Sequence, residues 1–305
     1  MRPSTRGALL TLLVGVLLAT PAAAAGNRKV IRVVLVPERN IFEQERKYRS
    51  LCDYACEQMP MNVRFEVLKG CREVLMALAD GKADAGFLGS FVGAYGMDKF
   101  GLIPLLRPEW ADGESYYSSY VFKRKEVPAT REISTWRGLS MVFASPHTSA
   151  GYFYPLALLR SEGIEEPGDF FSTITFSGSH DAAIWMVANG MADLGAVKNT
   201  IYEELSRRKP EMMANLEVLY TGGRFPDSTL MVTPAMTTEV REAMRTVFLR
   251  MGSQDQGLEV LRQFGARRFV AAATEDFGEV RKVVADSGHR LSDLQVLERR
   301  EGSPP

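Results

Sequence analysis

Two stretches of this sequence repeat one phrase, REVLMALADGKADAGF at residues 72–87 and DAAIWMVANGMADLGA at residues 181–196. The copies are offset by 109 residues and share the pattern Ala-(Asp/Asn)-Gly-x-Ala-Asp-x-Gly. Each copy predicts a helix that ends at a left-handed glycine, followed by an aspartate that leads into a buried strand. We interpret the repeat as two similar α/β lobes with the same helix-to-strand connection. The alternative is chance repetition of a common helix–glycine–strand phrase.

The sequence around both copies alternates between strand and helix patterns. Apolar and β-branched runs predict strands, and longer mixed segments predict helices. We expect strands at 30–36, 62–67, 85–88 and 140–144, and helices at 43–58 and 72–79. This alternation is typical of α/β domains, so each lobe is predicted to be a mostly parallel sheet flanked by helices.

Two β-rich segments, 117–122 and 228–232, are expected to cross between the lobes as a hinge. Lobe one would comprise residues 27–118 plus 233–305, and lobe two residues 119–232. Ligands of open α/β sheets lie beyond the carboxyl ends of the strands. Those ends are Gly89-Ser90 in one lobe and Lys198-Asn199-Thr200 in the other, so the two lobes would share one cleft.

Residues 1–25 have the pattern of a cleavable secretory signal peptide. Arg2 and Arg6 precede an apolar run at 8–19, and Pro21 leads into small residues at 22–26. The run is too short to span a bilayer stably. We expect cleavage after Ala24 or Ala25, no lipid anchor, and a soluble exported product.

Charge and motif content exclude several functions. The chain has 37 basic and 37 acidic residues, and loss of Arg2 and Arg6 leaves 35 against 37, so we expect no nucleic-acid binding. Only three histidines occur, His147, His180 and His289. Without a recognisable nucleophile, acid/base pair or metal motif, we expect neither an enzyme nor a cofactor or metal site.

The three cysteines, Cys52, Cys56 and Cys71, form an odd set in a compartment that permits disulfides. Cys52 and Cys56 lie four residues apart on a predicted helix and are poorly placed to bridge each other. Either could pair with Cys71. The alternative is that all three are small buried apolar residues.

Two polar segments follow strands and open helices, and both are candidates for binding an anion. The first is Ser145-Pro146-His147-Thr148-Ser149-Ala150-Gly151-Tyr152-Phe153-Tyr154-Pro155, and the second is Ser177-Gly178-Ser179-His180-Asp181. Helix starts leave N–H donors unsatisfied and carry partial positive charge. The alternative is that these hydroxyls only cap their own helices.

At these residues the chain resembles the PhnD family of periplasmic phosphate-, phosphite- and phosphonate-binding proteins of ABC importers. The family pattern Asp-Pro-Asn-Ser-Thr-Ser-Gly-Tyr-x-x-Pro is similar to 145–155, and Gly-Ser-His-(Asp/Glu)-Ala is similar to 178–182. The family's Gly-Lys-x-Asp-x-x-Phe-Leu-Gly stretch is similar to 81–89. The resemblance covers most of 30–235 and implies a two-lobed periplasmic binding protein of type 2, the Venus-flytrap fold.

The resemblance also implies which residues bind the ligand. Thr148, Ser149 and the N–H groups of Ala150 and Gly151 would hold the oxyanion, and His180 would donate to it. The strand ends add four further candidates: Ser90, Lys198, Thr200 and Asp227.

The chain departs from the family pattern at several positions. Ala150 replaces a hydroxyl residue, and Cys71 and Gly93 stand where many members have tyrosines. Thr200 stands where members that bind an aminoalkylphosphonate carry an acid, which argues against that ligand.

The resemblance therefore implies a monomeric solute-binding component of an ABC importer, located in the periplasm. Its ligand would be a small phosphorus oxyanion, and its partner a permease in the inner membrane. Three alternatives stay open. The same fold could serve as a sensing partner of a membrane kinase, it could bind another small anion, or it could bind ferric iron through Tyr116, Tyr117 and Tyr120.

Overall fold

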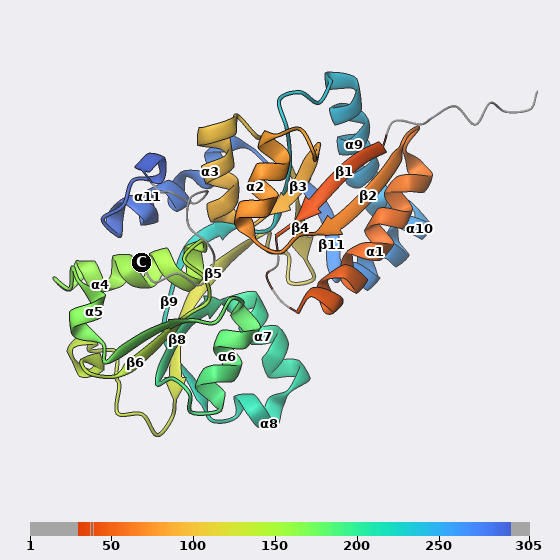
Figure 1. The fold of residues 1–305 in the computed structure, drawn as a ribbon. Coiled ribbons are helices and arrows are strands. Elements are labelled where there is room, and N and C mark those ends of the chain that lie inside the picture. The colour runs from red at the N-terminus through yellow and green to blue at the C-terminus, as the bar shows by residue number, and fades with distance from the viewer. Residues whose placement is uncertain (1–29, 37, 39, 294–305) are drawn as a thin grey trace, which may run out of the picture.

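A computed structural model describes residues 30–36, 38 and 40–293 as two α/β lobes (Figure 1). The predicted signal peptide, 1–25, lies outside these residues. The three cysteines are all free thiols, and Cys71 is the buried one. In the described part of the chain, every helix is too short or too polar to cross a membrane.

Lobe one is built on a six-stranded sheet of order β11-β4-β10-β3-β1-β2. Its strands are β1 (Val30–Leu35), β2 (Asn62–Val67), β3 (Ala85–Leu88), β4 (Ile103–Trp110), β10 (Thr229–Val232) and β11 (Ala266–Ala271). Its helices are α1 (Ile41–Gln58), α2 (Cys71–Ala79), α3 (Ser90–Phe100), α9 (Thr238–Arg250) and α10 (Asp255–Phe264), with a short turn η3 (Met251–Ser253).

Lobe two is built on a five-stranded sheet of order β7-β6-β8-β5-β9. Its strands are β5 (Tyr116–Arg124), β6 (Ser140–Phe143), β7 (Thr173–Phe176), β8 (Leu194–Lys198) and β9 (Leu216–Pro226). Its helical segments are η1 (Ile133–Trp136), η2 (Ser149–Phe153), α4 (Tyr154–Ser161), α5 (Pro167–Phe170), α6 (His180–Ala188), α7 (Asn199–Arg208) and α8 (Pro210–Met213).

The repeated phrase forms the same unit in both lobes. Gly81 and Gly190 have φ values of 68° and 74°, the left-handed conformation that ends α2 and α6. The next aspartate then fixes the neighbouring strand. Asp84 accepts a hydrogen bond from the backbone N–H of Arg32 in β1, and Asp193 accepts one from the N–H of Ser140 in β6, each at 2.9 Å. The prediction of two similar lobes is confirmed.

The sheets are mixed, which corrects the prediction of mostly parallel sheets. β1 pairs in parallel with β2 and β3, and β6 pairs in parallel with β7 and β8. The strands next to the hinge, β5 and β10, pair antiparallel with all their neighbours. A strand that enters from the other lobe has no crossover helix to impose a parallel direction.

The chain crosses between the lobes through short connections. Residues 111–115 link β4 to β5, and Asp227-Ser228 links β9 to β10. The two connections touch, because the N–H of Asp227 donates to the carbonyl of Ser115 at 3.1 Å. Thr229–Val232 pair with β3 and β4, so the predicted end of lobe two at 232 must move to this connection. A β-rich segment alone does not say which sheet it will join.

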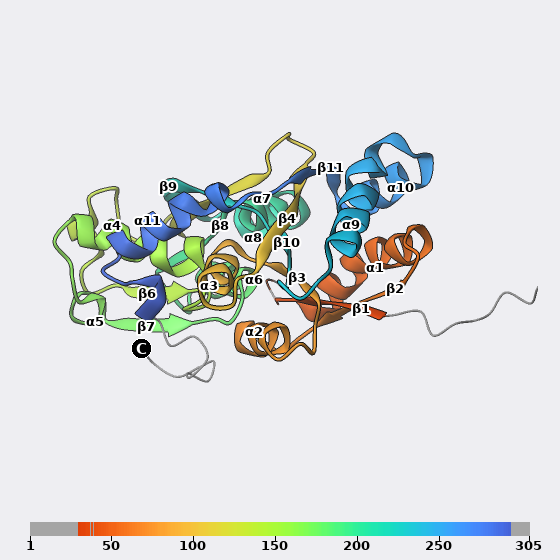
Figure 2. The same ribbon diagram turned by 90° about the horizontal axis from the view of Figure 1, so that it is seen from above.

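The C-terminal helix α11 (Gly278–Asp286) packs on both lobes instead of on lobe one alone. It follows the turn η4 (Thr274–Phe277) and precedes η5 (Leu291–Asp293). Val280 and Val284 share one buried cluster with Phe91 of α3 and Phe153 of η2. In Figure 2, α11 accordingly lies over α4 and away from α9 and α10. Residues of both lobes and of α11 therefore share one apolar cluster.

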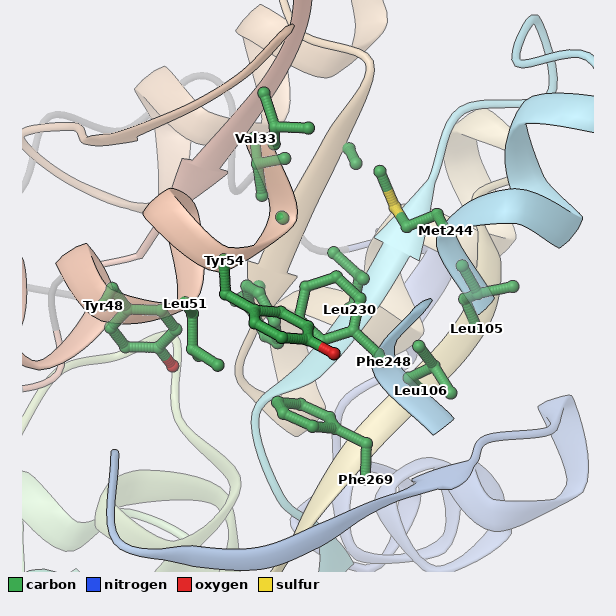
Figure 3. Packing of buried hydrophobic residues seen from close by; sticks show 14 of the residues in the cluster. Val33, Tyr48, Leu51, Tyr54, Leu105, Leu106, Leu230, Met244, Phe248 and Phe269 are labelled. Carbon is green, nitrogen blue, oxygen red and sulfur yellow. The ribbon is translucent and has the colours of Figure 1, made fainter. Parts of the chain in front are cut away.

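The core of lobe one lies between the sheet and helices α1, α9 and α10 (Figure 3). Leu51 and Tyr54 of α1 meet Phe248 of α9 and Phe269 of β11, and all four are at most 2% exposed. Burying side chains of this size contributes about 1.5–3 kcal/mol each. This core fixes the strand ends that carry the site.

Candidate functional site

A cleft of about 800 Å³ lies between the lobes, at the carboxyl ends of β1, β3, β6 and β8. Five of the predicted site residues line it: Ser90, Thr148, Ser149, His180 and Lys198. Ala150 and Gly151 of η2 and Thr200, in the first turn of α7, do not line this cleft. The cleft therefore lies where ligands of open α/β sheets are expected, beyond the carboxyl ends of the strands. We call this expectation the strand-end rule.

Lobe two presents donor groups at the start of η2. Thr148 is extended, and the chain then turns into a π-helical segment that Tyr154 closes by donating its N–H to the carbonyl of Ser149. The N–H groups of Ser149, Ala150 and Gly151 belong to the first turn, where no helix carbonyl is available. Pro155 lies in the first turn of α4, so the regular α-helix begins only there. The Thr148 hydroxyl donates to the carbonyl of Ser145 at 3.1 Å, and the Ser149 hydroxyl lies 2.8 Å from that of Ser90. The first turn of η2 therefore places three N–H groups next to two hydroxyls that are already hydrogen-bonded.

Gly151 allows this turn to approach its neighbours. A Cβ there would lie 2.7 Å from Thr148 Oγ1 and from Ala144 Cβ, and 3.1 Å from Cε1 of His180. Such distances are too short for a side chain, so the close contact between η2 and the first residue of α6 requires glycine.

His180 is held in one tautomer by the backbone of β8. Its Nδ1 accepts the N–H of Lys198 at 3.3 Å, so the proton of the neutral ring lies on Nε2. Ser179 caps α6 by accepting the N–H of Ala182. The ring is 5% exposed. His180 can therefore act as a fixed hydrogen-bond donor in the cleft.

Lys198 forms a buried ion pair with Asp227, and the two nearest charged atoms lie 2.6 Å apart. Asp227 also accepts from Trp110 Nε1 and from the N–H of Ser228, each at 2.6 Å. Burial by itself would raise the pKa of Asp227, but the Lys198 charge and these hydrogen bonds outweigh it and hold the pKa below its usual range. Asp227 is fully buried and does not line the cleft. It neutralises Lys198 instead of facing a ligand, which corrects its predicted role.

Glu38 is a cleft residue that the sequence did not predict. It follows β1, and its carboxylate lies 3.4 Å from Lys198 Nζ and accepts the Ser228 hydroxyl at 2.9 Å. Burial opposes the charge of Lys198, but Asp227 and Glu38 together raise the pKa of Lys198 above its usual value. The strand-end rule applied to β1 would have pointed to Glu38.

A chain of hydroxyls connects the lobes at the base of the cleft. Ser90 Oγ lies 2.5 Å from the Tyr117 hydroxyl and 2.8 Å from Ser149 Oγ. The Tyr117 ring lies under Lys198 Nζ at 4.5 Å, and burial raises the pKa of Tyr117 to about 12. Tyr117 thus stays neutral and can donate a hydrogen bond. The sequence placed it only in a crossing strand and in the iron alternative.

The tyrosines of the iron alternative do not converge. The hydroxyl of Tyr116 donates to Asp276 and that of Tyr120 donates to Glu203, each at 2.6 Å, whereas Tyr117 faces Ser90. Among the described residues, no three His, Cys, Asp or Glu side chains gather in a way that could hold a metal ion.

Two α/β lobes around one shared cleft, with donor groups at the strand ends, define the class of periplasmic solute-binding proteins. The model of one family, described as ABC transporter, phosphonate, periplasmic substrate-binding protein, matches residues 33–277. The chain belongs to this family, and the resemblance found in the sequence motifs is confirmed.

Two relatives found by sequence comparison are distant in sequence. The phosphate-import protein PhnD of Mycolicibacterium smegmatis is 23% identical over 235 residues, which are 74% of this chain and 73% of that protein. The probable ABC transporter phosphite binding protein PhnD1 of Prochlorococcus marinus is 20% identical over 277 residues, which are 88% of this chain and 92% of that protein.

Two solved structures are similar to this one. That of PhnD1 in complex with methylphosphonate has a TM-score of 0.77 at 19% identity and covers 86% of this chain and 99% of that chain. A binding protein component of an ABC phosphonate transporter from Pseudomonas aeruginosa has a TM-score of 0.78 at 16% identity, with coverage of 86% and 87%. The predicted two-lobed binding-protein fold is confirmed.

Proposed function

We propose that this protein captures a small phosphorus oxyanion, a phosphonate, phosphite or phosphate, in the cleft between its lobes. The observation that carries the proposal is the close approach of η2 to the start of α6, where a Cβ added at Gly151 would lie only 3.1 Å from Cε1 of the His180 ring. Relatives that import phosphate or bind phosphite and methylphosphonate support this ligand class.

The anion would be held mainly by oriented dipoles. Thr148 and Ser149 supply hydroxyls, the N–H groups of Ala150 and Gly151 point from the helix start, and His180 donates from Nε2. Lys198 contributes little net charge because Asp227 and Glu38 both face it. Charge-assisted hydrogen bonds to such dipoles are strong in a buried site.

Binding would be coupled to closure of the lobes. Ser149 of lobe two touches Ser90 of lobe one at 2.8 Å, so a ligand at η2 also meets α3. The backbone N–H of Asn40 donates to Asp181 across the cleft at 3.3 Å. A ligand that contacts both lobes favours the closed form, which an ABC permease in the inner membrane would then recognise.

The predicted export signal and the family together support a periplasmic location. In this proposal the protein acts as a monomer and binds its ligand without catalysis. The near balance of 35 basic and 37 acidic residues after signal removal argues against nucleic acid as a partner.

A ligand screen tests the proposal. A ligand that binds only the folded state raises the melting temperature, so phosphate, phosphite, methylphosphonate, aminoethylphosphonate and sulfate are compared by thermal shift and then by calorimetry. We expect at least one phosphorus oxyanion to bind more tightly than sulfate. The Thr148→Ala, Ser149→Ala double variant should fold normally and lose most of this affinity. Unchanged affinity in the double variant would contradict the site, and binding of none of the phosphorus oxyanions would contradict the function.

A further inference from the structure

The cleft is much larger than a small oxyanion needs. At about 30 Å³ for one water molecule in the liquid, its 800 Å³ corresponds to roughly 25 waters, whereas a tetrahedral oxyanion has five heavy atoms. Clefts of about 300–1,000 Å³ are typical of sites for organic ligands. The donors at η2 and α6 therefore occupy one part of the cleft and leave a second part beside them.

That second part is lined by apolar side chains that water reaches. Seven large hydrophobic residues are exposed among those the structure describes, and three of them line the cleft: Ile41, Phe42 and Trp185. Phe42 is 78% exposed and Trp185 is 50% exposed. Leu205 and Met212, both half-buried, line the same cleft from lobe two. Exposed apolar groups gathered in a cavity are typical of a binding site.

The two aromatic side chains come from opposite lobes, on helices that meet at the cleft. Phe42 lies in the first turn of α1, which Asn40 caps by accepting the N–H groups of Phe42 and Glu43. The Asn40 N–H in turn donates to Asp181 of α6, the helix that carries Trp185. Figure 1 shows this end of α1 on the side of lobe one that faces α6 and α7. The starts of α1 and α6 are therefore linked by a hydrogen bond, and both aromatic side chains line the same cleft.

The apolar part and the oxyanion donors line the same cleft. Trp185 is five residues after His180 on α6, which is about 7.5 Å further along the helix axis. At 3.6 residues per turn the two side chains leave α6 on different sides, so a substituent that starts at His180 must extend by at least this distance to meet Trp185.

We infer that the ligand of this cleft is an oxyanion with an apolar, aromatic substituent, whose ring lies against Phe42 and Trp185. The inference rests on the proposed function, because it places the oxyanion at η2 and His180. Burying a ring against aromatic side chains adds affinity by removing apolar surface from water.

The test compares two phosphonates by calorimetry on the mature protein. We expect phenylphosphonate to bind about tenfold more tightly than methylphosphonate. Trp185→Ala and Phe42→Ala should each weaken phenylphosphonate by at least about threefold and leave methylphosphonate within about twofold. Phenylphosphonate should also shift the tryptophan emission of the wild type to the blue, and Trp185→Ala should remove this shift.

Met191→Ala and Leu258→Ala are matched controls, since both residues are exposed and neither lines the cleft. They should change neither affinity. Two outcomes would overturn the inference without affecting the proposed function: equal affinity of the wild type for both phosphonates, or equal weakening of both by Trp185→Ala. The exposed apolar side chains would then be a contact surface for a protein partner. If phenylphosphonate, methylphosphonate, phosphite and phosphate all fail to bind, the proposed function falls and the inference with it.

Discussion

At equivalent positions of the repeated unit, lobe one places Cys71 and Gly89 on the cleft, and lobe two places His180 and Lys198 there. Cys71 and His180 are 109 residues apart, and so are Gly89 and Lys198. The backbones match down to the left-handed glycine, but lobe two supplies a hydrogen-bond donor and a cation where lobe one supplies a thiol and no side chain. Lobe one adds the acid Glu38 instead. In the proposed function, lobe two holds the anion through its hydrogen-bond donors and lobe one closes over it.

The largest expected effect comes from removing the cation that lobe two carries at the position of Gly89 in lobe one. Lys198→Met leaves Asp227 charged and buried, and breaking a buried pair in this way costs about 3–5 kcal/mol of unfolding free energy. Urea denaturation measures this loss. Lys282→Met removes a lysine from an exposed pair with Asp286 and should have no measurable effect. Equal behaviour of the two variants would contradict the role of Asp227 as the counterion of Lys198.

The next effect separates the two equivalent cleft residues. His180→Ala removes a fixed donor to the anion and should cost about 1.5–3 kcal/mol of binding free energy, measured by calorimetry with the tightest phosphorus oxyanion. Cys71→Ala, at the matching position of lobe one, should change affinity by less than about threefold. If the thiol variant lost as much affinity as the histidine variant, the two lobes would hold the anion equally.

A third substitution tests the close approach within lobe two. Gly151→Ala places a Cβ 2.7 Å from Ala144 Cβ and from Thr148 Oγ1, and 3.1 Å from Cε1 of His180, so the turn that carries Thr148 must shift. Such overpacking costs about 1–3 kcal/mol, and we expect weaker anion binding together with a lower melting temperature. Gly168→Ala is the control, because a Cβ there meets no atom within 4 Å. Normal affinity in Gly151→Ala would show that the donors at η2 do not depend on this contact.

The smallest expected effect concerns contact between the lobes at the edge of the cleft. Arg208 of α7 pairs with Glu43 of α1 at 3.3 Å, and its side chain is 49% exposed. Pairs at such positions contribute about 0.2–1 kcal/mol, so Arg208→Gln should lower ligand affinity by no more than about fivefold, and less at high salt. Arg262→Gln removes an exposed pair on α10 and should leave affinity unchanged. An identical effect of both variants would mean that this pair does not favour closure.

Much of the fold could be predicted because it depends on neighbours in the chain. The expected strands at 62–67 and 85–88 agree with β2 and β3 to the residue, and the helix expected at 43–58 begins two residues earlier, at Ile41. Asn40 explains this earlier start, because its side chain caps α1. The order of hydroxyls and N–H groups from Thr148 to Gly151 could also be read directly from the sequence.

The two similar lobes and the glycine-to-strand connections follow from the sequence, because periodicity and turn chemistry act over a few residues. Three features depend on packing between distant segments. β10 joins the sheet of lobe one, Asp227 faces Lys198 from 29 residues away, and Glu38 reaches the same lysine from 160 residues away. These pairings depend on how the sheets pack, and the energy of a buried charge depends on the groups that packing brings to it. The position of the cleft between the two lobes can therefore be predicted from local sequence patterns. Its charge balance and its apolar lining depend on packing.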